Sequence, residues 1–328
     1  MQKTSFNILR AAHAGLLVTN LEKALEFYTE VLGLELSADG LLANTAHLRT
    51  LAVKDACVLS LEEAEMPGVS HIAFRVGSDA DLEALELKAV ISNRAHYWMT
   101  ISPYHGRALR IADPNGMPIV FFHEMERDEM LLQQYDKHHG ARPMWLDHFN
   151  VFVPDVALSE RWFCENLGFR TSERLLTSED NVFAIWLHRK SNVHDIALTN
   201  GRGPRVHHIA FWVRDERSIL DACDILAACG MHGQIERGPA RHGISNAFFV
   251  YLRDPDGNRI ELFTGDYPIF DPDNPVITWH TDDPQYATFW GTPAPKSWFE
   301  EGMLVKGFDG CFITPRKPSI ETRPPTSD

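Results

Sequence analysis

The chain has 328 residues, of which 44% are hydrophobic and 23% charged, and its formal net charge at pH 7 is −14. These values are ordinary for a soluble globular protein, and the length predicts about two domains. The acidic balance and the lack of a basic run argue against a nucleic-acid partner, and the lack of a run of about 18 apolar residues argues against a membrane partner.

The cysteines are five in number and include no Cys-x-x-Cys pair. This usage is typical of a reducing compartment, where a free cysteine behaves as a small apolar residue. The first ten residues also lack the apolar core of a signal peptide. We therefore expect a cytoplasmic protein without a disulfide framework.

In chain order, the first feature is an internal repeat. Residues 13–33 read HAGLLVTNLEKALEFYTEVLG, and residues 148–168 read HFNVFVPDVALSERWFCENLG. Each segment predicts a short apolar strand that starts at a histidine, a helix cap seven positions later, and an amphipathic helix that ends at a glycine. The chain therefore contains two copies of one strand–helix unit.

A second repeated segment lies within each copy. Residues 70–78 read SHIAFRVGS and residues 207–215 read HHIAFWVRD, and each leads into a predicted helix, over 80–90 and 216–228. Each half then closes with an Asp-Pro turn and an apolar strand, DPNGMPIVFF in the first half and DPDGNRIELF in the second. The four units, which start near residues 10, 68, 145 and 205, predict an α+β protein.

These units divide the chain into two domains, 1–125 and 145–266. We expect residues 126–144 to connect them as a polar helix and a turn. Residues 267–328 are rich in proline and tryptophan, and we expect an irregular tail that lies over the second domain and ends in a frayed segment.

Three potential metal ligands come from three strands of the second domain, namely His148, His208 and Glu261. Two imidazoles and one carboxylate form the facial triad of non-haem iron oxygenases, which leaves coordination positions open for substrate and dioxygen. A lone acid in an apolar strand is unfavourable unless it is paired or bound to a metal. Glu261 therefore either binds an ion with the two histidines, forms a salt bridge, or lies on a solvated strand face.

The adjacent pair His207 and His208 requires a choice, because alternation along a strand sends neighbouring side chains to opposite faces. The equivalent positions in the first domain are Ser70 and His71. We therefore assign His208 to the metal and give His207 a supporting role.

The first domain serves as an internal control for the metal site. Its equivalent residues are His13, His71 and Val120, and the two histidines are 58 residues apart, against 60 for His148 and His208. Because the third position is apolar, we expect the first domain to be a metal-free structural copy.

The chain resembles the type I extradiol catechol dioxygenases of the vicinal oxygen chelate superfamily over nearly its whole length. The second half is especially similar to the homoprotocatechuate 2,3-dioxygenases. The motifs that carry this resemblance are LDHFN, HRK followed by VHD, GPRVHH, IERGPARHGISNAF, DPD followed by RIELFTGDY, and DPDNPVITW.

The resemblance implies a vicinal oxygen chelate fold, in which four βαβββ units pair into two open mixed-sheet barrels. It implies Fe(II), with Mn(II) as the alternative, at His148, His208 and Glu261. It also implies a catechol and O2 as reactants, ring cleavage beside the two vicinal hydroxyls, and a homo-oligomer that is typically a tetramer.

The resemblance further assigns roles around the metal. It implies that His194 is the acid–base residue, that Tyr251 and His242 contact the substrate oxygens, and that Asn150, Trp186 and Arg237 line the pocket. From the residues alone, structural uses stay open for these side chains, and Asn150 and Trp186 have ordinary ones as a strand asparagine and a buried tryptophan. Tyr251 suits a strand core, His242 suits a solvated loop, and His194 suits a pair with Asp195.

One departure from the family bears on the substrate. The homoprotocatechuate enzymes have two adjacent arginines in the tail, before a Trp-Gly, that bind the substrate carboxylate. Here residues 286–291 read YATFWG and contain no basic residue. A buried carboxylate would lack a bidentate partner there, so we predict an uncharged ring substituent.

The sequence thus predicts an extradiol dioxygenase that forms a muconic semialdehyde-type product, with residues 267–298 acting as a lid. The alternatives are a homoprotocatechuate 2,3-dioxygenase proper and another metal enzyme of the superfamily, either a glyoxalase-like isomerase or a hydroxyphenylpyruvate-type dioxygenase. A non-catalytic binding module is a further alternative, although it needs no acid–base residues.

Overall fold

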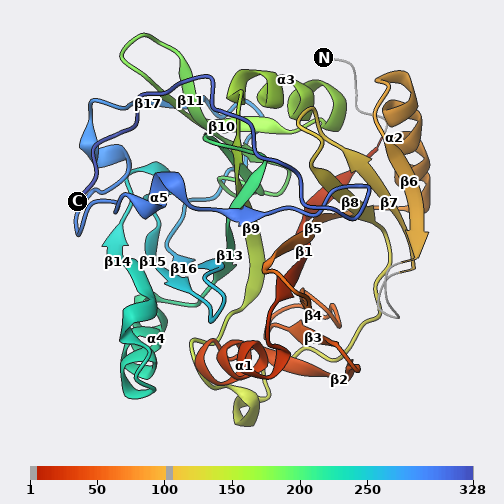
Figure 1. Cartoon of the computed structure of the whole chain (residues 1–328), viewed down its shortest axis with the longest axis vertical. Helices are drawn as coiled ribbons and strands as arrows, with labels where there is room; N and C mark the ends of the chain where they lie inside the picture. The colour runs from red at the N-terminus through yellow and green to blue at the C-terminus, as the bar shows by residue number, and fades with distance from the viewer. Residues whose placement is uncertain (1–5, 101–105, 328) are drawn as a thin grey trace.

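Two mixed β-sheets, one from each half of the chain, form the frame of the molecule (Figure 1). The structure is a computed structural model that describes residues 6–100 and 106–327. The strands of the first sheet have the order β2-β3-β4-β1-β5-β8-β7-β6. Their bounds are β1 Ile8–Val18, β2 Glu35–Leu41, β3 Thr45–Arg49, β4 Leu59–Glu63, β5 Gly68–Val76, β6 His96–Thr100, β7 Arg107–Ala112 and β8 Pro118–Phe122.

The second sheet has the order β14-β15-β16-β13-β9-β12-β11-β10-β17, and β18 pairs with β13. Its strands are β9 Trp145–Val153, β10 Arg170–Leu176, β11 Val182–His188, β12 Ile196–Asn200, β13 Arg205–Trp212, β14 Ile235–Arg241, β15 Phe248–Arg253, β16 Arg259–Thr264, β17 Ile277–His280 and β18 Met303–Leu304. The helices are α1 Leu21–Glu26, α2 Asp79–Ile91, α3 Val156–Leu167, α4 Glu216–Ala228 and α5 Ser297–Glu300.

The predicted internal repeat is confirmed by the strand pairing. In the first half, β1 pairs parallel with β4 and antiparallel with β5, and in the second half β9 pairs parallel with β12 and antiparallel with β13. The four units begin at β1, β5, β9 and β13, where the sequence placed them. The α+β class is therefore confirmed.

The helix α3 shows why the local sequence folds as predicted. Asp155 accepts a hydrogen bond from the backbone of Leu158 (2.9 Å), and Gly168 ends the helix in the left-handed region with φ 69°. Val156, Trp162 and Phe163 are buried on one face. The cap and the terminal glycine therefore define the two ends of α3, and the apolar stripe defines its buried face.

The equivalent first helix differs from the prediction. The α-helical part ends at Glu26, and a π-helical turn, Phe27–Val31, completes the segment. The Thr29 hydroxyl donates a hydrogen bond to the carbonyl of Leu25 (2.9 Å). This side-chain bond competes for a carbonyl that the α-helical backbone would otherwise use, which accounts for the wider turn.

Two expectations about the connecting segments are wrong. The connector contains a single short 3₁₀ turn, Tyr135–Lys137, in place of a polar helix. The tail is largely irregular, as expected, apart from short elements such as β17 and β18, which pair with β10 and β13. Its end is not frayed as expected but lies against the second domain, where the backbone N–H of Ser319 donates to the carbonyl of Pro154 (2.7 Å).

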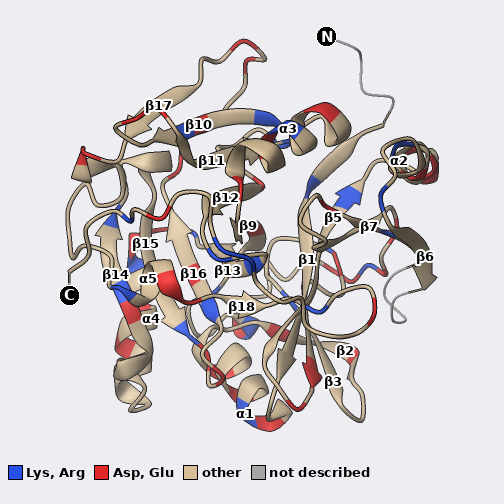
Figure 2. Ribbon diagram, turned by 45° about the horizontal axis from the view of Figure 1, so that its top comes forward, with Lys and Arg blue, Asp and Glu red and all other residues tan. Residues whose placement is uncertain are grey.

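The two halves share one hydrophobic core, with the Phe74 and Phe149 rings 5.9 Å apart across the boundary. Acidic residues lie along the helices α2 and α4 (Figure 2). Within residues 6–100 and 106–327, no helix is both long and apolar enough to cross a bilayer.

Candidate metal centre

The three predicted ligands meet on three adjacent strands. His148 lies on β9, His208 on β13 and Glu261 on β16, and the cross-strand register puts Ala210 opposite both His148 and Glu261. Both imidazole Nε2 atoms lie 3.1 Å from Oε2 of Glu261, and the two Nε2 atoms are 3.4 Å apart. All three side chains are buried.

These distances suit one metal ion. Donor atoms that bind an ion at about 2.1 Å and at right angles to each other are about 3 Å apart. The separations of 3.1, 3.1 and 3.4 Å match that spacing. His148, His208 and Glu261 form the one group of three potential ligands within the described part of the chain.

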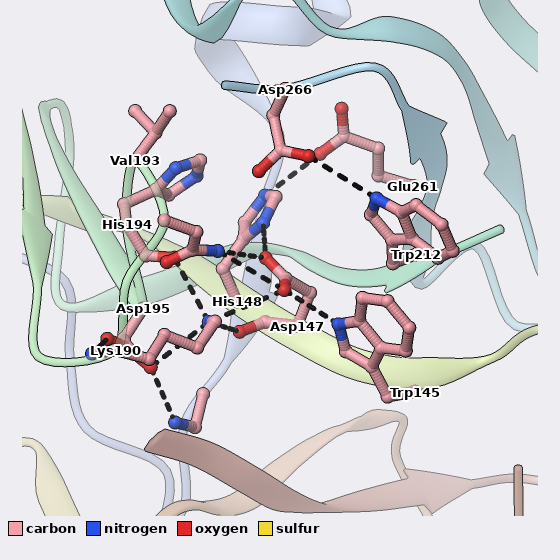
Figure 3. Close-up of polar contacts among 12 residues, drawn as sticks. Trp145, Asp147, His148, Lys190, Val193, His194, Asp195, Trp212, Glu261 and Asp266 are labelled. Carbon is pink, nitrogen blue, oxygen red and sulfur yellow. Dashed lines mark hydrogen bonds and ion pairs between the residues drawn. The ribbon is translucent and has the colours of Figure 1, made fainter. Parts of the chain in front are cut away.

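The second nitrogen of each imidazole has its own partner. Nδ1 of His148 lies 3.0 Å from Oδ2 of Asp147, and Nδ1 of His208 lies 2.7 Å from Nδ1 of His207 (Figure 3 shows the first contact). Nε2 of His207 in turn lies 2.9 Å from the carbonyl of Trp298. Hydrogens on these outer nitrogens leave the lone pair of each Nε2 directed at the metal position.

The contact between His207 and His208 depends on an irregularity in β13. The register between β13 and β9 shifts between Val206 and His208. A bulge of this kind re-aims side chains, which explains how two adjacent imidazoles touch although alternation would separate them. His207 therefore supports His208, as the sequence suggested, by a geometry that the sequence did not predict.

The charges at the site also suit a metal. Burial would raise the pKa of Glu261, but the imidazoles of His208 and His148 outweigh burial and hold that pKa well below its ordinary value. Burial lowers the pKa of His208 to about 4, whereas Asp147 and Glu261 outweigh burial and raise the pKa of His148. The site therefore presents an ionised carboxylate and a neutral His208 at pH 7, and a divalent ion would compete with a proton for Nε2 of His148.

A cavity that is partly open to solvent adjoins the three ligands, and the empty space in and above it is about 690 Å³. All the pocket residues implied by the resemblance line it: Asn150, Trp186, His194, Arg237, His242 and Tyr251. Its other walls are largely apolar and include Leu175, Phe183, Ile244, Trp298 and Phe299.

His194 lies beside the metal position. Its ring centroid is 3.8 Å from that of His148, and the two rings are visible together in Figure 3. Burial lowers the pKa of His194 well below its ordinary value. The ring is therefore neutral at pH 7 and can accept a proton inside the cavity.

Tyr251 and His242 form a hydrogen-bonded pair in the same cavity. The Tyr251 hydroxyl lies 3.1 Å from Nε2 of His242, and Nδ1 of His242 contacts the carbonyl of Ala287. Since Nδ1 donates to that carbonyl, Nε2 accepts from the Tyr251 hydroxyl. Burial raises the pKa of Tyr251 well above its ordinary value, so the phenol keeps its proton.

Asn150 and Arg237, two further pocket residues, are held by contacts with neighbouring residues. Asn150 Oδ1 accepts a hydrogen bond from the Thr199 hydroxyl (3.2 Å). Arg237 donates to the carbonyl of Ala287 (2.9 Å) and the hydroxyl of Thr288 (2.8 Å). Its guanidinium also stacks on Trp298, 4.6 Å from the ring centroid.

The first domain lacks a third ligand at the equivalent place. Nε2 of His71 lies 3.1 Å from Nδ1 of His13, so these two imidazoles contact each other. Val120 lies opposite Ala73 in the register and is buried in a small apolar cluster. Because Val120 stands where the second half has Glu261, His13 and His71 receive no carboxylate from that position to complete a facial triad.

Sequence reasoning missed several residues around the site. Asp147 is one, although its place directly before His148 was a usable signal. Trp298 is another, because nothing in the sequence predicted that its carbonyl and ring would reach the metal site from the tail. Lys190, which contacts Asp147 and Asp195, was also missed.

Comparison with known proteins agrees with this geometry. Residues 10–121 and 145–262 match the family described as the Glyoxalase/Bleomycin resistance protein/Dioxygenase superfamily. The crystal structure of homoprotocatechuate 2,3-dioxygenase from Arthrobacter globiformis superposes with a TM-score of 0.90 at 41% identity, over 94% of this chain and 95% of that one.

Two relatives of known activity are similar along their lengths. The manganese-dependent 2,3-dihydroxybiphenyl 1,2-dioxygenase of Geobacillus genomosp. 3 is 31% identical over 88% of this chain and 95% of its own. The metapyrocatechase of Geobacillus stearothermophilus is 30% identical over 93% of this chain and 96% of its own.

The chain therefore belongs to the glyoxalase, bleomycin resistance protein and dioxygenase superfamily. Within that superfamily it is an extradiol ring-cleaving dioxygenase, as the resemblance predicted. The glyoxalase-like isomerase, the hydroxyphenylpyruvate-type enzyme and the non-catalytic module are not supported by these relatives.

Proposed function

We propose that this dioxygenase cleaves catechols whose ring substituent is uncharged and forms a muconic semialdehyde-type product. The observation that carries the proposal is the tail segment 286–291, which contains no basic residue. Tyr286 and Ala287 of this segment line the cavity. A substrate carboxylate there would be desolvated without a bidentate cation.

Arg237 is the one lysine or arginine among the described residues that line the cavity, and its Nη2 is already engaged by the tail. Its guanidinium donates to Ala287 and Thr288 and stacks on Phe249 and Trp298. Burial lowers its pKa to about 10, so it stays charged at pH 7. Its Nε is buried without a hydrogen-bond partner in the described part of the chain, so a carboxylated substrate is the competing case that the substrate pair below tests.

The metal that we propose is Fe(II), with Mn(II) as the alternative, held by His148, His208 and Glu261. One relative is named as manganese-dependent, so both ions remain to be compared. When bound, such an ion lowers the pKa of a hydroxyl that binds to it and supplies the redox chemistry that O2 requires.

His194 is the proposed acid–base residue. Its neutral imidazole lies in the cavity beside His148 and is suited to accept a proton from a catechol hydroxyl and to return it later. Both atoms of O2 enter the product, so the overall reaction needs no external reductant.

The other proposed contacts position the substrate. The protonated Tyr251 hydroxyl has one hydrogen, which it donates to His242 in this structure. We propose that the hydroxyl turns toward the substrate and donates that hydrogen where charge develops on oxygen. Asn150 and Trp186 are proposed to flank the aromatic ring. The tail, including Tyr286 and Trp298, is proposed to cover the cavity as a lid.

The wider organisation is also part of the proposal. Residues 1–125 form a metal-free structural domain, residues 126–144 connect it to the catalytic domain at 145–266, and residues 267–328 form the tail. We further propose a cytoplasmic homo-oligomer, a tetramer by resemblance to the family. Light scattering on the purified protein measures the assembly directly.

A matched pair of substrates tests the proposed specificity. For the metal-loaded enzyme, kcat/KM for 4-methylcatechol should exceed that for 3,4-dihydroxyphenylacetate by at least about tenfold, because the two differ mainly in the carboxylate. The double variant Thr288→Arg/Phe289→Arg should lower the ratio of kcat/KM for 4-methylcatechol to kcat/KM for 3,4-dihydroxyphenylacetate. A preference for the carboxylated substrate would instead identify a homoprotocatechuate 2,3-dioxygenase, the second candidate, which the 41% identity favours.

A further inference from the structure

Lys190 lies in the loop between β11 and β12, behind the pair His148 and His194 (Figure 3). Its side chain is 20% exposed, whereas the carboxylates of Asp147 and Asp195 beside it are 3% and 0% exposed. Lys190 therefore sits at the edge of the site with its ammonium group turned inward. The proposed reaction gives this lysine no direct role.

The ammonium group of Lys190 has a complete set of partners. It donates to the carbonyl of Asp147 (2.6 Å), the carbonyl of His194 (3.2 Å) and Oδ1 of Asp195 (3.1 Å). Three acceptors match the three hydrogens of an ammonium ion. The first two acceptors belong to the residue before His148 and to His194 itself, so one side chain joins the two segments.

The positive charge of Lys190 also lies beside two buried carboxylates, those of Asp147 and Asp195. Oδ2 of Asp147 contacts Nδ1 of His148, and Oδ1 of Asp147 lies 3.4 Å from the Lys190 ammonium. Asp147 therefore bridges the Lys190 ammonium group and the imidazole of His148, and its second oxygen is placed to orient that ring.

Asp195 connects this group to the metal-free half. Its Oδ1 accepts a hydrogen bond from the backbone N–H of Ala11 in β1 (2.9 Å), and its Oδ2 accepts from the N–H groups of Arg189 (2.6 Å) and Lys190 (3.1 Å). Arg189 also donates to the carbonyl of Ile8 in β1 (3.2 Å). The loop that carries His194 is therefore attached to the first domain.

We propose that Lys190, together with Asp195, is a positioning residue that sets the placement of His194 relative to the metal ligand His148. It touches neither substrate nor metal and acts through the backbone of both histidine segments. The inference rests on the proposed roles of His148 and His194. It also gives the first domain a role, because the Ala11 N–H and the Lys190 ammonium group donate to the same oxygen of Asp195, Oδ1.

Displacement of a reacting group by about 1 Å lowers a rate by about a hundredfold. Lys190→Ala should therefore lower kcat for catechol by about tenfold to a hundredfold. The bound metal and the KM should stay within about threefold of the wild type, because the ligands and pocket walls remain. Lys54→Ala, at an exposed lysine in the first domain, is the matched control and should keep the wild-type kcat.

Chemical rescue separates positioning from a general loss of stability. Lys190 lines a solvent-open cleft with Asp147, Ser191 and Asn192, which gives small amines access to the vacated place. Ethylammonium should restore part of the kcat of Lys190→Ala, because it brings a charge and three N–H donors. Tetramethylammonium, which brings the charge without donors, should not.

A structural measurement adds a readout that does not depend on activity. In crystals of metal-free Lys190→Met, the ring centroids of His148 and His194 should lie farther apart than the 3.8 Å of the wild type, by more than the tolerance of about 0.5 Å expected of a working site. Lys190→Met keeps the aliphatic packing, and it takes the place of Lys190→Ala in the kinetic assay if the alanine variant does not fold.

The outcomes are distinct. A kcat within threefold of the wild type, or a loss in a folded and metal-replete variant that ethylammonium does not restore, would overturn the proposal for Lys190. An unchanged separation of the two rings in Lys190→Met would also overturn it. If the wild-type enzyme does not consume O2 with catechols, the proposed substrate class fails instead, and the ring separation still decides the role of Lys190.

Discussion

Tyr28 in the first half donates a hydrogen bond from its hydroxyl to Oδ2 of Asp254 in the second half, at 3.0 Å. Asp254 begins the Asp-Pro-Asp-Gly turn that leads into β16, the strand of Glu261. The relation is reciprocal, because Asn115 in the sister turn donates to the hydroxyl of Ser159 in α3 (3.0 Å). Each half therefore places its closing turn against the first helical segment of the other.

Replacing Tyr28 with phenylalanine tests this contact. The variant removes one donor from a buried carboxylate, which should lower the free energy of unfolding by about 1–3 kcal/mol. Urea denaturation of the two proteins measures the difference. Tyr135→Phe is the control, because Tyr135 is 69% exposed, and it should change stability by less than about 0.5 kcal/mol. Equal losses in both variants would show that the contact is not specific.

Glu236 should make stability depend on acid pH. Its carboxylate forms two hydrogen bonds with Arg259, at 2.6 and 2.8 Å, and also binds Arg253. Burial would raise the pKa of Glu236, but the two arginines outweigh burial and lower it to about 2. The carboxylate therefore stabilises the fold fully above about pH 4.5, and this contribution, about 3 kcal/mol, is lost as the pH falls toward 2.

In the Glu236→Gln variant the fully buried Arg259 loses its counter-ion, so at pH 7 the free energy of unfolding should fall by about 3–5 kcal/mol. The difference from the wild type should shrink between pH 5 and pH 3, as measured by urea denaturation at each pH. Glu83→Gln, at an exposed pair with Arg107, should show no such trend. A difference in unfolding free energy between Glu236→Gln and the wild type that stays constant with pH would contradict the assignment of this pH dependence to Glu236.

The metal-binding role of the second half is tested by a pair of equivalent substitutions. His148→Gln should abolish stoichiometric iron binding, because one of three ligands is removed. His13→Gln, at the repeat-equivalent position of the first half, should leave the iron content unchanged. Elemental analysis of both purified variants gives the comparison. Iron loss in His13→Gln, with retention in His148→Gln, would reverse the assignment of the two halves.

His194→Phe should lower kcat by about 10²–10⁴-fold while the iron content stays unchanged, because general acid–base catalysis contributes about that much. Phenylalanine keeps a planar ring against His148 and removes both nitrogens. Steady-state kinetics with catechol measures the effect, and His47→Phe, at a buried histidine of the first domain outside the cavity, serves as the control. A kcat for His194→Phe within threefold of the wild type would exclude an acid–base role.

Much of the fold could be predicted from the sequence, because its signals are local. The cap at Asp155 and the glycine at 168 define α3, and the doubled strand–helix pattern predicts the repeat. The apolar Val120 at the position equivalent to Glu261 distinguishes the two halves by residue type alone. Periodicity and spacing suffice for these features.

Other features depend on long-range contacts that no local pattern reports. The bulge at His207 that lets it support His208 is a property of the pairing with β9. The contact between Ala11 and Asp195 joins residues 184 positions apart. The reach of Trp298 into the cavity depends on how the tail packs, and Thr29 diverts the first helix through a single side-chain bond.

The most direct test of the central claim is O2 uptake by the wild-type protein after anaerobic loading with Fe(II). With catechol and air, we predict one O2 consumed for each catechol and a yellow ring-fission product of the muconic semialdehyde type. Absence of uptake with catechol, 3-methylcatechol, 4-methylcatechol and 3,4-dihydroxyphenylacetate alike, in protein that holds stoichiometric iron, would contradict the account.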